Sequence, residues 1–590
     1  MSPALFLCWL VSLPLVGAVL LTVSRQPTRA RLIATGTAAL TLVLAIAAPH
    51  LAGGTPARLV VPWFNVTVHL CVDGPSARAL PLIALLALVT LISSPRQDSH
   101  RQVLTALLLT ESATLGFFCA HDVVPRLLFF LAMAVPLARG RHSPSAGRAV
   151  RVYLLLGTLP VLLPLAMLGW HGGLKAPFLS PEELASLLPH GWRAGLCALL
   201  LVGGCARLAV VPFHSWLPVA LKRGPLGVGV LWMNLAASLH LLTQVVHPLL
   251  PSEWDAVAPA LGSLGAGAAL YGALLALVQT DLRRMLAFLL VSQSGLLLAG
   301  VALGGPAGRS GAWLQCLSMG VAFTGLELLI RAIEARTGTT DMDTRHGLIT
   351  RAPRMATSFL LLGLGALGFP GTLGFVSEDL LLRGTLGAHP LLALPLLPAL
   401  ALNAITLVRA FQRAFLGPRP RGTRSTEDLL PRERWTTLAL VVLLCVAESP
   451  TAQDSSGPMS LRLLEELGER VVQQRLAGLH VPTGAEEGQP DALANTHLGF
   501  FHLPPRHPRP SQSPHQHITQ EGPERRRGVT VDEFARVPLR EVLPPEVMVE
   551  VRQGLRCLIH DGRHLRVQSR HESFGQVSVG SENVLRILHI

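Results

Sequence analysis

The chain has 590 residues, of which 50% are hydrophobic and 14% are charged, and its mean hydropathy is +0.47. Soluble domains carry roughly 25% charged residues, so this composition excludes an ordinary soluble protein and indicates a membrane protein. The formal net charge of +13 does not indicate nucleic-acid binding, because the basic residues lie in short loops between apolar runs, without a recognition motif. The apolar runs also lack the short alternating pattern of transmembrane strands.

Apolar runs that approach the ~20 residues needed to span a bilayer recur as far as residue 449. The first run begins next to Met1 and has no clear cleavage site, which predicts a retained helix rather than a signal peptide. We predict about fourteen transmembrane helices, at residues 3–23, 31–49, 79–94, 103–120, 123–138, 150–169, 193–211, 225–247, 257–278, 283–302, 311–332, 356–382, 390–415 and 435–449.

The loops between these runs differ in charge. The loop at 248–257 contains Glu253 and Asp255 but no lysine or arginine. The positive-inside rule assigns loops rich in lysine and arginine to the cytoplasm. We therefore predict a multi-pass protein of a bacterial-type inner membrane, with both termini in the periplasm. The basic loops lie near residues 25–31, 96–101, 139–151, 222–223, 283–284, 336–354 and 413–424.

Five ionisable residues are predicted to lie at membrane depth, where a charge is costly unless it is paired or hydrated. Chains of such groups relay protons across membranes, because each group can hold or release a charge that lipid would not tolerate. We therefore regard all five as candidates for a proton path. They are Glu111, Arg207, His240, Glu327 and Glu378.

Structural roles compete with transport at two of these positions. Glu327 lies four residues before Arg331, which is the spacing of an ion pair on one helical face, and this interpretation is favoured. His240 lies on a leucine-rich face, where a hydrogen-bonded core histidine is the commoner outcome. Glu378 differs, because glycines and Pro370 precede it and predict a broken helix whose freed backbone lines a wet cavity.

Several motifs occur in an order and spacing that resemble a known family. Together they resemble the antiporter-like membrane subunits of respiratory complex I, of the chain M or mitochondrial subunit 4 type, over about residues 60–450. The resemblance implies an all-α fold with two inverted five-helix repeats and discontinuous helices, followed here by a C-terminal extramembrane tail. The motifs are Asp73–Ser76 (DGPS), Val211–Pro218 (VPFHSWLP), Gln279–Ala287 (QTDLRRMLA), Ser292–Gly295 (SQSG), Gly368–Gly371 (GFPG) and Phe375–Glu378 (FVSE).

The resemblance also implies a function and partners. It implies a membrane subunit that takes part in proton translocation coupled to electron transport in an NADH:quinone oxidoreductase, or a subunit of a related multisubunit cation/proton antiporter. The partners are then other membrane subunits and the lipid bilayer. Cofactors and a catalytic site are not expected on this chain, because NADH, flavin, iron–sulfur clusters and quinone belong to partner subunits. The eight cysteines also lack the spacing of a cluster or metal site.

The titrating residues of the family are only partly present when they are carried over by position. The seventh-helix lysine falls on Arg207 and the twelfth-helix acid on Glu378. The fifth-helix glutamate falls on Ala132, the eighth-helix lysine on Ser238 and the eleventh-helix histidine on Met319. Arginine keeps its proton whereas a buried lysine readily loses it, so these changes alter the proton path. Two alternatives follow: a conducting subunit with an altered path, and a non-conducting scaffold.

The chain changes character near residue 450. We predict an antiporter-like transmembrane domain at 1–450 and an extended linker rich in Pro, His and Arg at 451–527. A small C-terminal region of unknown role follows at 528–590, where the turn signal Asp561–Gly562 predicts a β-hairpin. The linker histidines lack the cysteine or acidic spacing of a metal site, so no metal is predicted.

Overall fold

The computed structural model describes residues 2–24, 26–52, 57–61, 66–93, 100–138, 144–172, 180–223, 227–343, 347–417 and 428–446. Within these ranges the chain is almost entirely helical, as predicted, and contains one β-hairpin. The predicted linker at 451–527 and the hairpin predicted within 528–590 lie outside the described residues.

The N-terminal half of the described chain contains short helices and interruptions between its long helices. Its elements are α1 (Pro3–Val23), α2 (Pro27–Ala52), β1 (Ala57–Val61), β2 (Val66–Leu70), α3 (Gly74–Ser93), α4 (Arg101–Cys119), α5 (Val123–Ala132), α6 (Ala134–Ala138), α7 (Pro144–Gly172), α8 (Pro181–Leu187), α9 (His190–Arg207), the 3-10 turn η2 (Phe213–Ser215) and α10 (Trp216–Arg223).

The C-terminal half begins with a helix that contains a π-helical turn. Its elements are α11 (Val228–Leu241), the π-helical turn η3 (Leu242–Val246), α12 (His247–Leu249), α13 (Pro251–Val278), α14 (Leu282–Leu303), α15 (Gly305–Thr337), the 3-10 turn η4 (Leu348–Thr350), α16 (Pro353–Ala366), α17 (Leu373–Ala388), α18 (Pro390–Ala393), α19 (Leu396–Phe415) and α20 (Pro431–Val446).

Nine helices in the described ranges are long and apolar enough to cross a membrane. The predicted total of fourteen is not tested by length alone, because some predicted spans are divided. The run predicted at 123–138 is divided at Met133 into α5 and α6, and the run predicted at 356–382 is divided into α16 and α17. A discontinuous span is therefore present where Gly368–Gly371 predicted one.

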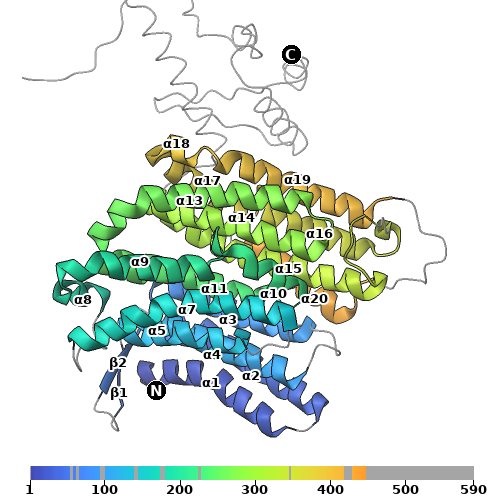
Figure 1. The fold of residues 1–590 in the computed structure, drawn as a ribbon. Helices are drawn as coiled ribbons and strands as arrows, with labels where there is room; N and C mark the ends of the chain where they lie inside the picture. The colour runs from blue at the N-terminus through green and yellow to red at the C-terminus, as the bar shows by residue number, and fades with distance from the viewer. Residues whose placement is uncertain are drawn as a thin grey trace, which may run out of the picture. The chain divides into compact units, whose positions relative to one another are not determined.

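The hairpin was not foreseen from the sequence. Strands β1 and β2 pair antiparallel from Ala57 opposite Leu70 to Val61 opposite Val66, and they lie beside α1 (Figure 1). The backbone just after β2 also contacts the end of α4, because the amide of Cys71 donates to the carbonyl of Cys119 at 2.8 Å. The hairpin is thus attached to the helices that precede the fifth predicted span.

The centre of the helical part is formed by α11, α14 and α15. Every residue of α11 is buried, which is the pattern of a helix covered on all sides by other helices. By contrast, α2 buries only one face, and its larger side chains, among them Leu40 and Ile46, are exposed as expected toward lipid. The buried face of α2 is a stripe of small residues: Ala30, Ala34, Ala38, Thr41, Ala45, Ala48 and Ala52.

Helices α13 and α14 lie side by side and approach closely through glycines (Figure 1). A Cβ atom on Gly272 would lie 2.5 Å from the backbone nitrogen of Ser292, and one on Gly295 would lie 2.4 Å from that of Ala269. Small residues at such positions allow dispersion contacts between helix backbones, which drive packing where the solvent is lipid. This packing fixes the rotation of α14 and thereby the direction of its polar side chains.

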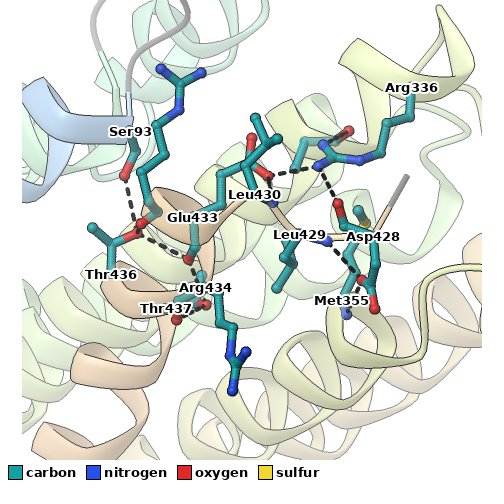
Figure 2. Close-up of polar contacts among 12 residues, drawn as sticks. Ser93, Arg336, Met355, Asp428, Leu429, Leu430, Glu433, Arg434, Thr436 and Thr437 are labelled. Atoms are coloured by element: carbon teal, nitrogen blue, oxygen red, sulfur yellow. Dashed lines mark hydrogen bonds and ion pairs between the residues drawn. The ribbon is translucent and has the colours of Figure 1, made fainter. Parts of the chain in front are cut away.

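A polar cluster joins the start of α20 to the ends of two other helices (Figure 2). Arg336, in the last turn of α15, donates to the backbone carbonyl of Asp428 at 2.9 Å and to the carboxylate of Glu433 at 2.7 Å. The Asp428 carboxylate accepts from the amides of Arg354 and Met355 at 3.1 and 3.2 Å, and so caps the N-terminus of α16. These contacts hold α20 against α15 and α16.

The cysteines of the described ranges differ in burial. Cys119, Cys197, Cys205 and Cys316 are buried, Cys8 and Cys71 are partly buried, and Cys445 is exposed on α20. An apolar run alone does not say which face of a membrane helix meets lipid, so a small apolar residue in that run falls on either side.

Candidate functional site

Glu378 lies just after the break between α16 and α17. The break contains two residues with left-handed backbone conformation, Gly368 with φ +64° and Gly371 with φ +90°. A Cβ atom on Gly368 would lie 2.4 Å from Oε2 of Glu378, so only glycine leaves room for the carboxylate here. The broken helix therefore places the carboxyl group against the freed backbone.

A buried glutamine connects Glu378 to α14. The side chain of Gln315, on α15, donates from Nε2 to Oε1 of Gln293 at 2.8 Å and to Oε1 of Glu378 at 3.3 Å. Its own Oε1 accepts a hydrogen bond from the hydroxyl of Ser377. Gln293 and Gln315 are each 2% exposed and Ser377 is fully buried, so solvent does not compete for these contacts. We call Gln293, Gln315, Ser377 and Glu378 the glutamine network.

The network brings together two motifs that are far apart in the sequence. Gln293 belongs to the Ser292–Gly295 motif, whereas Ser377 and Glu378 belong to the Phe375–Glu378 motif. Gln315 bridges the two motifs, because its side chain is hydrogen-bonded to Gln293 in one and to Ser377 and Glu378 in the other. Gln315 was missed by sequence reasoning, because a single glutamine within a long helix that is otherwise largely apolar gives no sign of its direction.

The polar region extends to α19 through a second amide. Asn403 is 2% exposed, and its Nδ2 donates to the hydroxyl of Ser292 at 2.9 Å. The carbonyl oxygen of the same side chain has no hydrogen-bond partner among the described residues. Buried polar atoms of this kind are normally satisfied by internal water. Helices α14, α15, α17 and α19 thus enclose a polar site around Glu378.

Arg207 is bound by a backbone carbonyl and an aromatic ring. It is the last residue of α9 and is 1% exposed. Its NH1 donates to the carbonyl oxygen of Phe130, and its Cζ lies 4.1 Å from the centroid of the Phe130 ring. Phe130 is in the last turn of α5, where carbonyls lack intrahelical partners and a positive charge is favourable. Arg207 therefore caps the C-terminus of α5 and makes a cation–π contact.

The position that carries the family's fifth-helix glutamate does not compensate this charge. Ala132 ends α5 and is exposed. Within the described ranges, Arg207 makes no ion pair with Glu111 or with Glu378, and its Nε and NH2 atoms have no hydrogen-bond partner. In the described part of the chain, the hydrogen-bond acceptor of Arg207 is a backbone carbonyl.

His240 is enclosed by aromatic rings. It is fully buried on α11, and its ring centroid lies 4.6 Å from that of Phe118, 5.4 Å from that of Phe117 and 5.6 Å from that of Trp313. Neither ring nitrogen has a hydrogen-bond partner among the described residues. The ring therefore packs in the core, as its leucine-rich face predicted, and aromatic faces and edges surround it.

The same aromatic residues connect His240 with the surroundings of Arg207. The rings of Phe117 and Phe130 are in contact, with 5.7 Å between their centroids. Phe130 in turn makes the cation–π contact with Arg207. We call Phe117, Phe118, Phe130 and Trp313 the aromatic cluster. Its three phenylalanines are at most 1% exposed. Between Arg207 and His240 the contacts are thus made by apolar rings rather than by polar side chains.

A second buried arginine was missed by the sequence analysis. Arg126, on α5, is 4% exposed, and its Nε donates to the carbonyl of Ala120 at 2.8 Å. Its NH1 donates to the carbonyl of Gln244 at 3.2 Å, within the π-helical turn η3. A π-turn frees a backbone carbonyl from its usual partner, and the arginine binds it. A basic residue inside an apolar run was the available signal.

Glu111 and Glu327 differ in their surroundings. Glu111 is fully buried on α4, and neither carboxylate oxygen has a hydrogen-bond partner among the described residues. Glu327 pairs with Arg331 at 2.5 Å, as its spacing predicted, and its second oxygen accepts from the amide of Val228 at 3.0 Å. Glu327 thus caps the N-terminus of α11 and pairs with Arg331, whereas Glu111 is a solitary buried acid.

The two other positions carried over from the family hold no exchangeable charge. Ser238 is fully buried and donates to the carbonyl of Asn234 on its own helix at 2.8 Å, whereas Met319 is 1% exposed in the core. The structure therefore brings Glu378 into a polar network, whereas no hydrogen bond or ion pair joins Glu111, Arg207 and His240 to one another within the described ranges.

Comparison with known proteins agrees with this geometry. Residues 120–401 match the family described as "NADH:quinone oxidoreductase/Mrp antiporter, TM". NADH-quinone oxidoreductase subunit M of Pseudomonas aeruginosa is 27% identical over 479 residues, which cover 75% of this chain and 93% of that protein. Among solved structures, a chain of respiratory complex I from Thermus thermophilus aligns with a TM-score of 0.68 and 26% identity, covering 75% of this chain and 94% of that one.

A further solved structure shares the fold. A chain of the Mrp complex from Dietzia sp. DQ12-45-1b aligns with a TM-score of 0.66 and 21% identity, and covers 75% of this chain and 94% of that one. At this identity the match concerns the fold alone. The resemblance seen in the motifs is confirmed: residues 120–401 match this family, and the relative and the complex I chain above are similar to the chain over most of their own length.

Proposed function

We propose that this chain is a membrane subunit of a complex I-type NADH:quinone oxidoreductase and takes part in proton translocation coupled to electron transfer. The family match and the similarity to subunit M over almost the whole length of that protein support the assignment. The observation that carries it is the broken helix that holds Glu378 against a buried glutamine network.

Glu378 is the residue we propose to carry the proton. A carboxylate can take a proton from water on one side and release it to the other, with only its own O–H bond formed and broken. Gln315 supplies a donor to the charged form, and the break in the helix gives the carboxyl group backbone neighbours instead of a packed apolar face. Discontinuous helices are typical of ion sites in membrane transporters.

We propose that the N-terminal half of the domain does not conduct in the same way. Arg207 stays protonated, because a guanidinium does not release its proton in proteins. It is bound to a carbonyl that has no protonation equilibrium, and the aromatic cluster lies between it and His240. Proton transfer needs polar side chains or water, and rings supply neither. Glu111, Arg207 and His240 are then elements of stability in this half.

A specific observation favours a second candidate function, that of a non-conducting scaffold between active subunits. Ala132 replaces the family's glutamate, and Arg207 serves as a helix cap instead of as a switching partner. If the C-terminal half were also inactive, the chain would only join its neighbours. Membership of a multisubunit cation/proton antiporter is the other alternative, and it differs in the partners rather than in the fold.

We further propose that the protein lies in a bacterial-type inner membrane with both termini on the periplasmic side. The alternating basic loops support this orientation. The end of α15, the start of α16 and the start of α20 then face the cytoplasm together, which agrees with the polar cluster that joins them.

Two experiments test the proposal. In the first, the full-length chain is purified from native membranes through an affinity tag, and its partners are identified by mass spectrometry. Subunits that carry NADH and quinone sites are expected, and small cation-antiporter subunits in their place would contradict the assignment.

In the second experiment, the complex is reconstituted in vesicles and proton uptake is measured during electron transfer. Glu378→Gln should reduce uptake per electron, because an amide does not exchange protons in this pH range. Asp379→Asn is the matched control, since Asp379 is the adjacent acid and pairs with Arg383 at 2.9 Å outside the network. Uptake that is unchanged by Glu378→Gln at equal assembly would favour the scaffold.

A further inference from the structure

Every polar atom of the Gln315 side chain is hydrogen-bonded within the glutamine network. The two protons of Nε2 have two acceptors, Oε1 of Gln293 at 2.8 Å and Oε1 of Glu378 at 3.3 Å. Oε1 of Gln315 accepts from the hydroxyl of Ser377, which also lies 2.8 Å from the carbonyl of Gly374. The amide therefore has one definite orientation as long as Glu378 only accepts.

Protonation of Glu378 changes what the carboxyl group requires. An ionised carboxylate accepts hydrogen bonds only, whereas a protonated carboxyl has an O–H group that must donate. The atom facing it in this structure is Nε2 of Gln315, which has no acceptor capacity. When the proton is on Oε1 of Glu378, the O–H group points at a donor unless the amide of Gln315 turns over and presents its own Oε1.

The network contains the groups that such a turn requires. After the turn, Oε1 of Gln315 accepts from the O–H of Glu378, and Nε2 donates to the hydroxyl oxygen of Ser377, whose own proton now turns to the carbonyl of Gly374. Gln293 keeps its contact if its amide also turns and donates from Nε2. No hydrogen bond is lost overall, so the two arrangements are matched alternatives.

We propose that Gln315 is a positioning residue whose amide turns over when Glu378 gains or loses a proton, and which passes this change to Gln293 on α14. The inference rests on the proposed function, because it takes Glu378 as the proton-exchanging group. Burial of Gln293, Gln315 and Ser377 makes the coupling tight, since no bulk water can replace a lost partner. Glu378 protonation is thereby linked to the helix that packs on α13.

The coupling is tested by infrared spectroscopy on the purified full-length complex. The pH is titrated, and the C=O band of protonated Glu378 is followed together with the side-chain amide bands of isotope-labelled glutamine. Glu378→Gln identifies the carboxyl band, and Gln293→Leu identifies the contribution of Gln293. In the wild type, the amide bands should change over the same pH range as the carboxyl band.

The variants separate coupling from simple packing. In Gln315→Leu, the Glu378 band should still titrate, but the response of Gln293 should fall at least threefold, because the connecting amide is absent. Gln279→Leu is the control, since Gln279 donates to the carbonyl of Leu275 outside the network and its removal should leave both responses unchanged. Ser377→Ala provides a milder second variant, which removes the acceptor needed after the turn and should at least halve the amide response.

Two outcomes would overturn the inference: amide bands that do not follow the titration of Glu378 in the wild type, or a full Gln293 response in Gln315→Leu. The spectra do not depend on transport or on the identity of the partners. If the amide and carboxyl bands titrate together while Glu378→Gln leaves proton uptake unimpaired, the proposed function alone is contradicted. If the bands do not titrate together while Glu378→Gln loses uptake, only the role of Gln315 is contradicted.

Discussion

Arg207 donates a hydrogen bond to the carbonyl oxygen of Phe130 and lies over the ring of the same residue, with 4.1 Å between its Cζ atom and the ring centroid. One residue on α5 therefore contacts the arginine at the end of α9 through both its carbonyl and its ring, and neither contact involves an acid. A carbonyl and a ring hold a permanent charge but cannot take up or release a proton. This relationship distinguishes the N-terminal half from the region around Glu378.

The first prediction concerns Arg207. Arg207→Met keeps much of the side-chain volume and removes a buried charge, so the gain from avoided desolvation offsets the lost hydrogen bond, and stability should change by less than about 1.5 kcal/mol. Arg207→Ala leaves a cavity and should cost about 2–5 kcal/mol. Proton uptake should stay within about twofold of the wild type in both variants. Thermal unfolding in detergent and uptake in vesicles measure these effects.

Protein levels must be matched for this comparison, because a less stable variant assembles less. An Arg207→Met complex that assembled normally and yet lost uptake would show that the arginine acts on the proton path. The N-terminal half would then have to be regarded as conducting.

The second prediction concerns Gly368. Gly368→Ala forces a side chain into a left-handed backbone conformation, at a cost of about 1–2 kcal/mol, and places Cβ 2.4 Å from Oε2 of Glu378. The carboxyl group must move away from Gln315, so uptake should fall about tenfold or more while the melting temperature falls only modestly. Gly363→Ala is the control, because Gly363 is helical and has open space at the Cβ position. Wild-type uptake by folded Gly368→Ala protein would argue against a positioned carboxyl group.

The third prediction concerns the buried ion pair of Glu327 and Arg331. Arg331→Met leaves a buried carboxylate without this partner and should destabilise the protein by about 3–5 kcal/mol. Adding Glu327→Gln removes that charge but keeps an acceptor for the amide of Val228. The double variant should therefore be more stable, by about 0.5–3 kcal/mol, than the sum of the stability changes of the two single variants predicts. A double-mutant cycle of thermal stability measures this interaction energy.

The pair of Asp379 and Arg383, which is partly exposed, has the same spacing of four residues and serves as the comparison. Its interaction energy should not exceed about 0.5 kcal/mol, because solvent screens an exposed pair. Equal energies for the two pairs would mean that burial of Glu327 does not strengthen its pairing.

The fourth prediction concerns orientation. A cysteine introduced at Ser455 should react with a membrane-impermeant maleimide added to intact cells, because that position follows the last predicted span on the periplasmic side. Thr350→Cys, at an exposed position in the basic segment between α15 and α16, should react only after the cells are opened. The unmodified chain gives the background from its own eight cysteines. The opposite labelling pattern would reverse the orientation or change the number of spans.

Part of this molecule could be predicted from the sequence because the signals are local. The apolar runs set the positions of α1, α2, α13 and α14 closely, since length and hydropathy are properties of one segment. The break before Glu378 followed from glycine and proline chemistry in Gly368–Gly371, and the pair of Glu327 and Arg331 followed from helical spacing. The choice of Glu378 as a transport residue remains a proposal.

Only the tertiary structure decided which polar groups meet. Gln315 lies 22 residues from Gln293 and 63 residues from Glu378, and Arg207 lies 77 residues from Phe130. Helices α11 and α15 are buried almost all round, so their sequences carry no amphipathic stripe that would show which face meets which neighbour. The direction of Gln315 and the enclosure of His240 therefore depend on helix rotations that are set by packing, such as the glycine contacts of α13 and α14. A hydropathy pattern locates a membrane helix along the chain, but the angle about its axis comes from its neighbours.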